Sequence, residues 1–302
     1  MPAPTILDLV TAWRPDPTTT AIIVAVAGCY LWGWRRARLG AGCAATLLLG
    51  CLLWLWAGSG FPGAYGDTLF WARALQVVTL LMLTPFLLAA ARPVTAAAAL
   101  PGLRRPLMRA GRSPAARLLL SPWTTSIALL LTPWLLYLTR WYPAVLHHGA
   151  VDTVTRLWLV LVGVVYFYAR LQVDPVPRRR HAGLSLLVST AEALGDGALG
   201  VVLWQGPMVA ASYYEALHRG WGPDPRTDQT IGAGILWVLG DVLGLPFLIF
   251  LFHRLRADDE RTAAREDARL DVAPTAAAAD EAVTEEPWWV GDPRLAERFK
   301  RG

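Results

Sequence analysis

Residues 67–91 decide the fold of this chain, and they read DTLFWARALQVVTLLMLTPFLLAAA. After Asp67 the stretch is almost wholly apolar, and it is long enough to cross a bilayer as a helix, which takes about 20 residues. It nevertheless contains Arg73. A charge in hydrocarbon costs roughly 3 kcal/mol on insertion scales, so such a residue usually faces the interior of a bundle and marks a working site.

Six further stretches of this kind occur along the chain, and no strand-like alternation competes with them. The sequence is 55% hydrophobic and 17% charged, with a mean hydropathy of +0.38, which is typical of a membrane protein. We therefore predict an all-α fold with seven transmembrane helices within residues 18–255, an extracytoplasmic segment at 1–17 and a polar cytoplasmic tail at 256–302. The expected spans are 18–34, 41–59, 67–91, 119–139, 151–171, 183–210 and 231–253.

Arginines gather in alternate loops between these spans and predict the orientation of the chain. Under the positive-inside rule such loops lie in the cytoplasm, which places the N-terminus outside and the C-terminus inside. We therefore expect a multi-pass protein of the bacterial plasma membrane, in contact with the lipid bilayer and without a nucleic-acid partner. The arginines of these loops are Arg35, Arg36, Arg38, Arg92, Arg104, Arg105, Arg109, Arg112, Arg117, Arg178, Arg179, Arg180, Arg254 and Arg256.

Four ionisable residues accompany Arg73 inside the spans, namely Arg156, Glu192, Asp196 and Asp241. Glu192 and Asp196 are four residues apart and therefore share one helix face. Arginines and carboxylates at compatible depths predict a buried ion-pair network. Two interpretations are open: contacts between helices that fix their packing, or a site for an ion, a proton or a polar group of a partner.

Signals for catalysis and for metal binding are weak. The chain has no GxSxG, Walker or Rossmann motif, and we do not expect an enzyme. The candidate metal ligands are the adjacent His147 and His148 and the cysteines Cys29, Cys43 and Cys51, none of which forms a CxxC pair. Thiolates are soft copper ligands, although single cysteines in helices are more often small packing residues.

Three patches of the chain resemble the CtaG-type assembly factors of caa3-type cytochrome c oxidase. Residues 227–237 read TDQTIGAGILW and are similar to the family's opening of its last span, here with Asp228, Gln229, Gly234 and Trp237. Residues 173–179, VDPVPRR, match a family stretch with Asp174 and Pro175. The third family span is matched by Gln76 and Pro85. The resemblance covers roughly residues 20–260 and identifies a divergent actinobacterial member.

The resemblance implies a link to copper delivery, with oxidase subunits or another assembly factor as partners. The chain departs from the family where its histidines are expected, because Arg73, Arg156 and Asp196 stand there instead. A guanidinium group stays protonated and cannot ligate a metal. We therefore hypothesise that a salt bridge among these residues replaces a metal site of the family.

The interpretation we favour is a protein that supports oxidase biogenesis by binding a partner or an assembly intermediate, in a groove around the third, fifth, sixth and seventh spans. Two alternatives remain open at this point. One is a copper-binding protein that uses its cysteines, methionines and the outer His147 and His148. The other is a small proton-coupled transporter in which Glu192, Asp196 and Asp241 form a relay.

Overall fold

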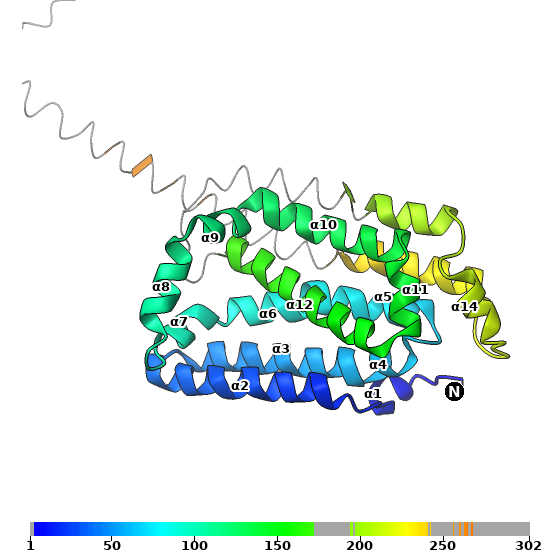
Figure 1. Ribbon diagram of the computed structural model, residues 1–302, viewed down its shortest axis with the longest axis horizontal. Helices are drawn as coiled ribbons and strands as arrows, with labels where there is room; N and C mark the ends of the chain where they lie inside the picture. Colours follow the sequence, from blue (N-terminus) through cyan, green and yellow to red (C-terminus); the bar gives the residue numbers. More distant parts are fainter. Residues whose placement is uncertain are drawn as a thin grey trace, which may run out of the picture. The chain divides into compact units, whose positions relative to one another are not determined.

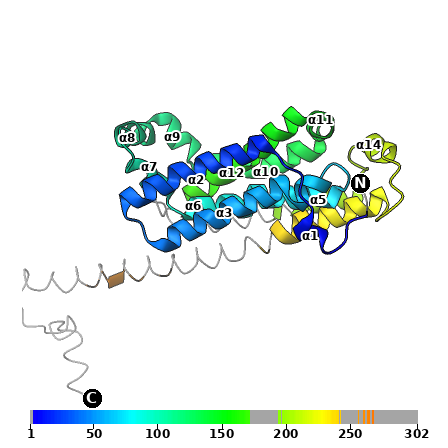
Figure 2. The same cartoon turned by 90° about the horizontal axis from the view of Figure 1, so that it is seen from below.

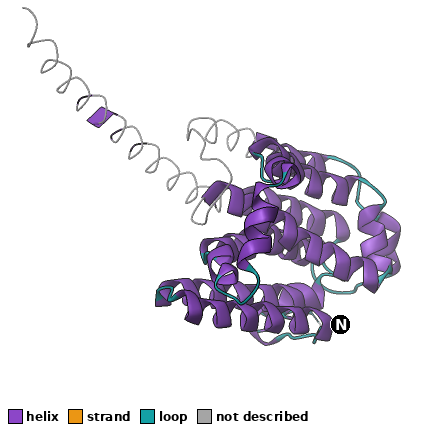
Figure 3. Ribbon diagram, turned by 60° about the vertical axis from the view of Figure 1, so that its left-hand side comes forward, coloured by secondary structure: helices purple, strands orange, loops and turns teal. Residues whose placement is uncertain are grey.

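The computed structural model describes residues 3–171, 194–195, 197–240 and the isolated positions 242, 256, 260, 263, 264 and 267. Every regular element in these residues is a helix, as Figure 3 shows. The all-α class is therefore confirmed for the described part of the chain. Five predicted site residues lie outside it: Asp174, Pro175, Glu192, Asp196 and Asp241.

The chain divides into two compact units, residues 1–252 and 253–302, and all helices described below belong to the first. Their bounds are α1 Asp8–Thr11, α2 Pro17–Ala37, α3 Ala41–Ser59, α4 Phe61–Tyr65, α5 Phe70–Val78, the π-helix η1 Thr79–Leu83, α6 Thr84–Ala90, α7 Pro93–Ala98, α8 Arg104–Arg112, α9 Pro114–Leu119, α10 Pro122–Leu138, α11 Trp141–His147, α12 Gly149–Leu171 and α14 Ala211–Ala216. Residues 197–205 and 225–240 are also helical.

Three helical segments are long and apolar enough to cross a membrane: Ala41–Tyr65, Phe70–Ala90 and Gly149–Leu171. They correspond to the second, third and fifth expected spans, and α10 contains a shorter apolar helix, Trp123–Leu138. The protein therefore has the character of a membrane protein. Seven spans and their orientation stay predictions.

The segment Phe70–Ala90 is the central helix of this unit. It is made of α5, η1 and α6, and it packs against α3 and against α12 (Figure 1). Pro85 has no N–H and cannot donate to the carbonyl of Leu81, which favours an irregular turn just before it. The irregular turn is η1. Gly163 of α12 lies at this turn, where a Cβ atom would overlap the Leu81 carbonyl and the Pro85 ring, so only glycine lets the two helices approach this closely.

Figures 1 and 2 show that the loops and short helices collect at two ends of this unit. At one end lie α1, α4, α11 and α14, together with the start of α2 and of α12; we call it the aspartate end, after Asp16, Asp67 and Asp152. At the other end lie α7, α8 and α9; we call it the arginine end, after the arginines at 92–117. A buried aromatic cluster joins α5, α10, α11 and α14 and consists of Phe70, Tyr137, Tyr142 and Tyr214.

Candidate functional site

Arg73 is the best-bound polar side chain at the aspartate end. It lies in the first turns of α5 and is only 4% exposed. Its guanidinium donates to Asp67 at 2.6 Å, to Asp152 at 2.6 Å, to the Gln76 side chain at 2.7 Å and to the Gly66 carbonyl at 3.2 Å. Every nitrogen of the group therefore has a partner, which is what a buried guanidinium needs to offset its loss of hydration.

Arg156 of α12 is the second buried arginine and lies close to the first. It pairs with Asp16 at 3.0 Å and with Asp152, one helical turn earlier, at 3.1 Å. It also donates to the Gly58 carbonyl at the end of α3. Asp152 thus bridges Arg73 and Arg156, one with each carboxylate oxygen.

A more exposed pair, Arg14 and Asp67, extends these contacts at 2.7 Å. Together these contacts form an unbroken series of three arginines and three aspartates with alternating charge, which we call the ion-pair chain. Its members, in spatial order, are Arg14, Asp67, Arg73, Asp152, Arg156 and Asp16. Its formal charges cancel. It connects the N-terminal segment, α2, the loop before α5 and α12.

Asp16 has a second function in this chain, because it is also the N-cap of α2. Its carboxylate accepts hydrogen bonds from the backbone N–H groups of Thr18 and Thr19 and from the Thr19 hydroxyl. Partial burial raises the pKa of the Asp16 carboxyl. These hydrogen bonds and the charge of Arg156 together lower the pKa by more than burial raises it, so it lies below its ordinary value. Asp16 is therefore ionised at neutral pH and stabilises both the helix start and the pair.

The Asp228 and Gln229 side chains form a second polar cluster, and both bind backbone groups. The α5 helix begins without a side-chain cap of its own. The Asp228 carboxylate accepts the N–H groups of Phe70 and Trp71 at 3.1 and 3.0 Å, and Arg219 donates to it at 3.1 Å. Asp228 is thus a remote cap of α5, where a negative charge is stabilised by the helix dipole.

Gln229 binds the turn that follows the helix at 197–205. Its amide nitrogen donates to the carbonyls of Leu203 and Pro207, and its oxygen accepts from the N–H of Val209. Gln76 acts in the same way between α5 and α3, since its amide donates to the Ala57 carbonyl at 2.7 Å while its oxygen accepts from Arg73. These glutamines position backbone segments.

Small residues bring the helix at 225–240 close to its neighbours. A Cβ atom on Gly197 or Gly200 would lie 3.1 or 2.8 Å from the side chain of Trp237, and one on Gly232 would overlap the ring of Phe70. These glycines therefore allow close contact between the helices. A Cβ atom on Gly234, by contrast, would meet no atom of the described residues within 4 Å apart from those of its own helix.

The candidate metal ligands do not converge. The His147 ring packs against Tyr213, with 5.3 Å between the ring centroids, and the cysteines range from the exposed Cys29 through Cys43 to the buried Cys51. In the part of the chain that the structure describes, no three His, Cys, Asp or Glu side chains are grouped so that they could hold a metal ion. The described residues thus supply no ligand set for copper, and the copper role stays a prediction.

The predicted site residues Arg73 and Arg156 lie together in the structure, where Asp152 bridges them. The structure pairs them with Asp16, Asp67 and Asp152, whereas Asp196, the expected partner, lies outside the described residues. The i,i+4 spacing of Asp152 and Arg156 and the capping position of Asp16 before Pro17 are signals that sequence reasoning missed.

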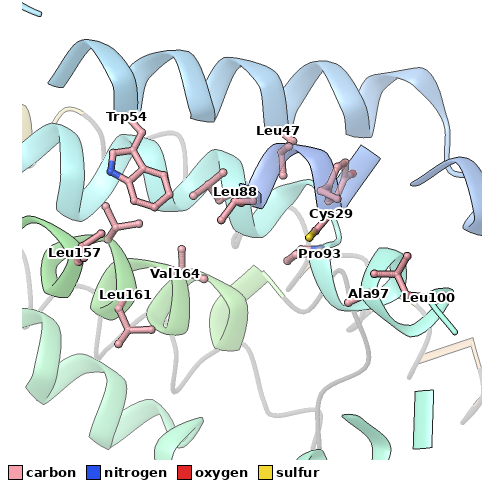
Figure 4. Close-up of a pocket in the computed structure, with 13 residues that line it drawn as sticks. Cys29, Leu47, Trp54, Leu88, Pro93, Ala97, Leu100, Leu157, Leu161 and Val164 are labelled. Carbon is pink, nitrogen blue, oxygen red and sulfur yellow. The ribbon is translucent and has the colours of Figure 1, made fainter. Parts of the chain in front are cut away.

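An apolar groove of about 420 Å³ runs between α2, α3, α6, α7 and α12 (Figure 4). Its wall includes Cys29, Trp54, Leu88, Ala97, Leu161 and Val164, and the hydroxyl of the lining Tyr30 donates to the Ala91 carbonyl. The groove expected around the third, fifth, sixth and seventh spans stays a prediction, because much of the sixth and seventh spans lies outside the described residues. Where the described parts of the third, fourth, sixth and seventh spans meet, a cavity of about 30 Å³ is lined by Met82, Pro133, Leu199 and Leu236.

Comparison with known proteins gives one family and three relatives. The model of the cytochrome c oxidase caa3 assembly factors matches residues 28–258. Three mycobacterial proteins without an assigned function are each 26% identical to the chain, two over 290 residues in Mycobacterium bovis and Mycobacterium tuberculosis and one over 286 residues in Mycobacterium leprae. The matches cover 89% of this chain but 43% of each relative, so the chain spans less than half the length of these relatives. No solved structure matches.

Proposed function

Because this chain belongs to the family of cytochrome c oxidase caa3 assembly factors, we propose that it supports oxidase biogenesis by holding a transmembrane segment of an oxidase subunit or of another assembly factor. The observation that carries the proposal is the family match over residues 28–258, which contains the apolar groove almost entirely. The proposed role is binding, without a catalytic step and without a step through a metal.

The apolar groove is the binding surface in this proposal. Lipid tails are as apolar as leucine, so helices in a membrane associate through close packing and not through the hydrophobic effect. A hollow of about 420 Å³ with apolar walls provides such packing for a few aliphatic or aromatic side chains of a partner helix. The exposed Cys29 and Leu161, on α2 and α12, lie on its accessible part.

The ion-pair chain supports this proposal because it holds the groove walls from one end. Asp16 and Arg156 connect α2 with α12, and the bond from Arg156 to the Gly58 carbonyl connects α12 with α3. A preformed groove loses less entropy when it binds. Arginines do not release protons at physiological pH, so the ion-pair chain itself favours a fixed scaffold over a proton relay.

The test is complementation of a strain that lacks this protein, with assembled oxidase and its activity as readouts. We expect Val164→Trp, which fills the groove, to reduce assembled oxidase several-fold. Val24→Trp makes the same change on the exposed surface of α2 outside the groove and is expected to have no effect. The amount of each variant in the membrane is measured in parallel.

A photo-crosslinking amino acid at position 161 then identifies the occupant. We expect adducts with a transmembrane subunit of the oxidase or with another assembly factor, detected with antibodies against those proteins, and none from position 24. A normal amount of assembled oxidase in the strain without the protein would contradict the proposed function. A normal amount of assembled oxidase with an abundant Val164→Trp variant would contradict only the assignment of the groove as the binding surface.

A further inference from the structure

The arginine end carries a cationic surface that nothing in the described chain neutralises. Residues 92–121 contain six arginines and neither aspartate nor glutamate. All six side chains are exposed: Arg92, Arg104, Arg105, Arg109, Arg112 and Arg117. Within the described ranges none of them has an ion-pair partner. Such a surface attracts anions.

A cavity of about 470 Å³ lies at this surface. Its floor is apolar and is formed by Leu107 and Met108 of α8, by Leu120 and by the ring of Tyr168 at the end of α12. Arg104 and Arg112, at the two ends of α8, line the same cavity. A ligand that combines an anionic group with an apolar part would therefore match it.

The helices at the cavity have the composition of helices that lie on a membrane surface. The α8 and α9 helices combine exposed arginines with exposed apolar side chains, which include Met108, Leu118 and Leu119, and Leu103 just before α8 is exposed as well. Short helices of this composition lie at the boundary between headgroups and acyl chains. Clusters of arginine next to transmembrane helices bind anionic lipid headgroups.

We propose that this cavity is a binding site for one anionic phospholipid. The phosphate of the headgroup binds Arg104 and Arg112, because guanidinium groups match phosphate oxygens with paired hydrogen bonds. An acyl chain lies along Leu107, Met108 and Leu120. Free phosphate satisfies only the arginines and leaves the apolar floor uncovered, so the site takes a lipid. The site is independent of the proposed oxidase partner.

The first experiment compares lipids on the full-length protein in detergent, with native mass spectrometry as the binding measurement. Phosphatidylglycerol and phosphatidylcholine with identical acyl chains are titrated, and glycerol phosphate serves as the headgroup alone. We expect phosphatidylglycerol to bind at least tenfold more tightly than either of the other two. Equal binding of the two lipids, or equally tight binding of glycerol phosphate, would overturn the proposal.

The second experiment uses variants with matched controls. Arg104→Gln together with Arg112→Gln is expected to weaken phosphatidylglycerol binding roughly tenfold or more, since each arginine near an anionic surface contributes about a fivefold factor. Arg105→Gln together with Arg109→Gln removes the same charge from the same helix outside the cavity, and we expect less than about a threefold loss. Equal losses from the two pairs would show a diffuse charge effect and refute the cavity.

Gly111→Trp tests the apolar part of the cavity without a change of charge. Gly111 lines the cavity and a Cβ atom there meets open space, so the indole ring fills the hollow without forcing the helix apart. We expect loss of phosphatidylglycerol binding with an unchanged unfolding temperature in lipid-free detergent. Retained binding would overturn the proposal. A photo-crosslinking amino acid at position 107 that yields protein adducts instead of lipid adducts in native membranes would overturn it as well.

Discussion

The ion-pair chain at the aspartate end and residues 92–121 at the arginine end hold their arginines in opposite ways. At the aspartate end, Arg73 and Arg156 are buried and every charge in the ion-pair chain has an opposite neighbour. At the arginine end, six arginines are exposed over thirty residues without a single acid. An arginine that is neutralised inside the protein fixes helices, whereas one that the protein leaves uncompensated is available to an external anion.

The largest expected difference between the two ends comes from removal of a buried charge. Arg73→Met removes the central cation of the ion-pair chain: Asp67 and Asp152 each keep one arginine, and the Gln76 oxygen loses its donor. We expect the free energy of unfolding to fall by about 3–5 kcal/mol. The measurement is denaturant unfolding of the purified protein in detergent. Arg109→Met at the arginine end is the control. Similar free energies of unfolding for the two variants would contradict the claim that the buried, paired arginine stabilises the fold more than the exposed one.

The remote cap of α5 gives the next largest effect. Asp228→Ala leaves the N–H groups of Phe70 and Trp71 and the Arg219 charge without their carboxylate, and we expect a loss of about 2–3 kcal/mol. Hydrogen exchange at the start of α5 should accelerate at the same time. Asp224→Asn preserves the capping oxygen for Arg226 and Thr227 and is expected to stay within about 0.5 kcal/mol.

Asp16 makes part of the aspartate end sensitive to acid. Its folded-state pKa lies below its ordinary value of 3.8, so the ionised carboxylate stabilises the fold above that pH. This contribution is lost as the pH falls through the folded-state pKa. We expect Asp16→Asn to cost about 1 kcal/mol at pH 7, and the difference from wild type to disappear as the pH falls through the folded-state pKa. Unfolding temperatures of both proteins across this range provide the measurement, and a constant difference would exclude the pair with Arg156.

The smallest effect is expected for single charges at the arginine end. Arg105→Gln removes an exposed side chain without an ion-pair partner in the described chain, and we expect the free energy of unfolding to change by less than about 0.5 kcal/mol. In lipid-free detergent, the effect of Arg105→Gln on the free energy of unfolding should also not change with salt concentration. A destabilisation above 1 kcal/mol would mean that the arginine end has a structural role as well.

Parts of this arrangement follow from local sequence. The apolar length of residues 67–91 predicts the central helix, and Pro85 predicts the irregularity that the structure shows as η1. The exceptional position of Arg73 in that stretch predicts a buried polar group with a partner. The family resemblance is confirmed by the family match over residues 28–258.

The partners of these residues did not follow from local sequence. Arg73 meets Asp152, which is 79 residues away, and Phe70 meets Asp228 across 158 residues. No periodicity connects such pairs, because they depend on which helix ends come to lie side by side. The same holds for the apolar groove, whose walls come from five helices.

The sequence by itself determined that the described chain forms apolar helices with arginines at both ends, because the length of each apolar run and the composition of each loop are local properties. Only the tertiary structure decided which arginines are neutralised. Asp16, Asp67 and Asp152 reach Arg73 and Arg156 because the starts of α2 and α12 and the loop before α5 meet at one end. The arginines of residues 92–121 meet no acid in the described part of the fold, because ion pairing acts over a few ångströms in space and not along the chain.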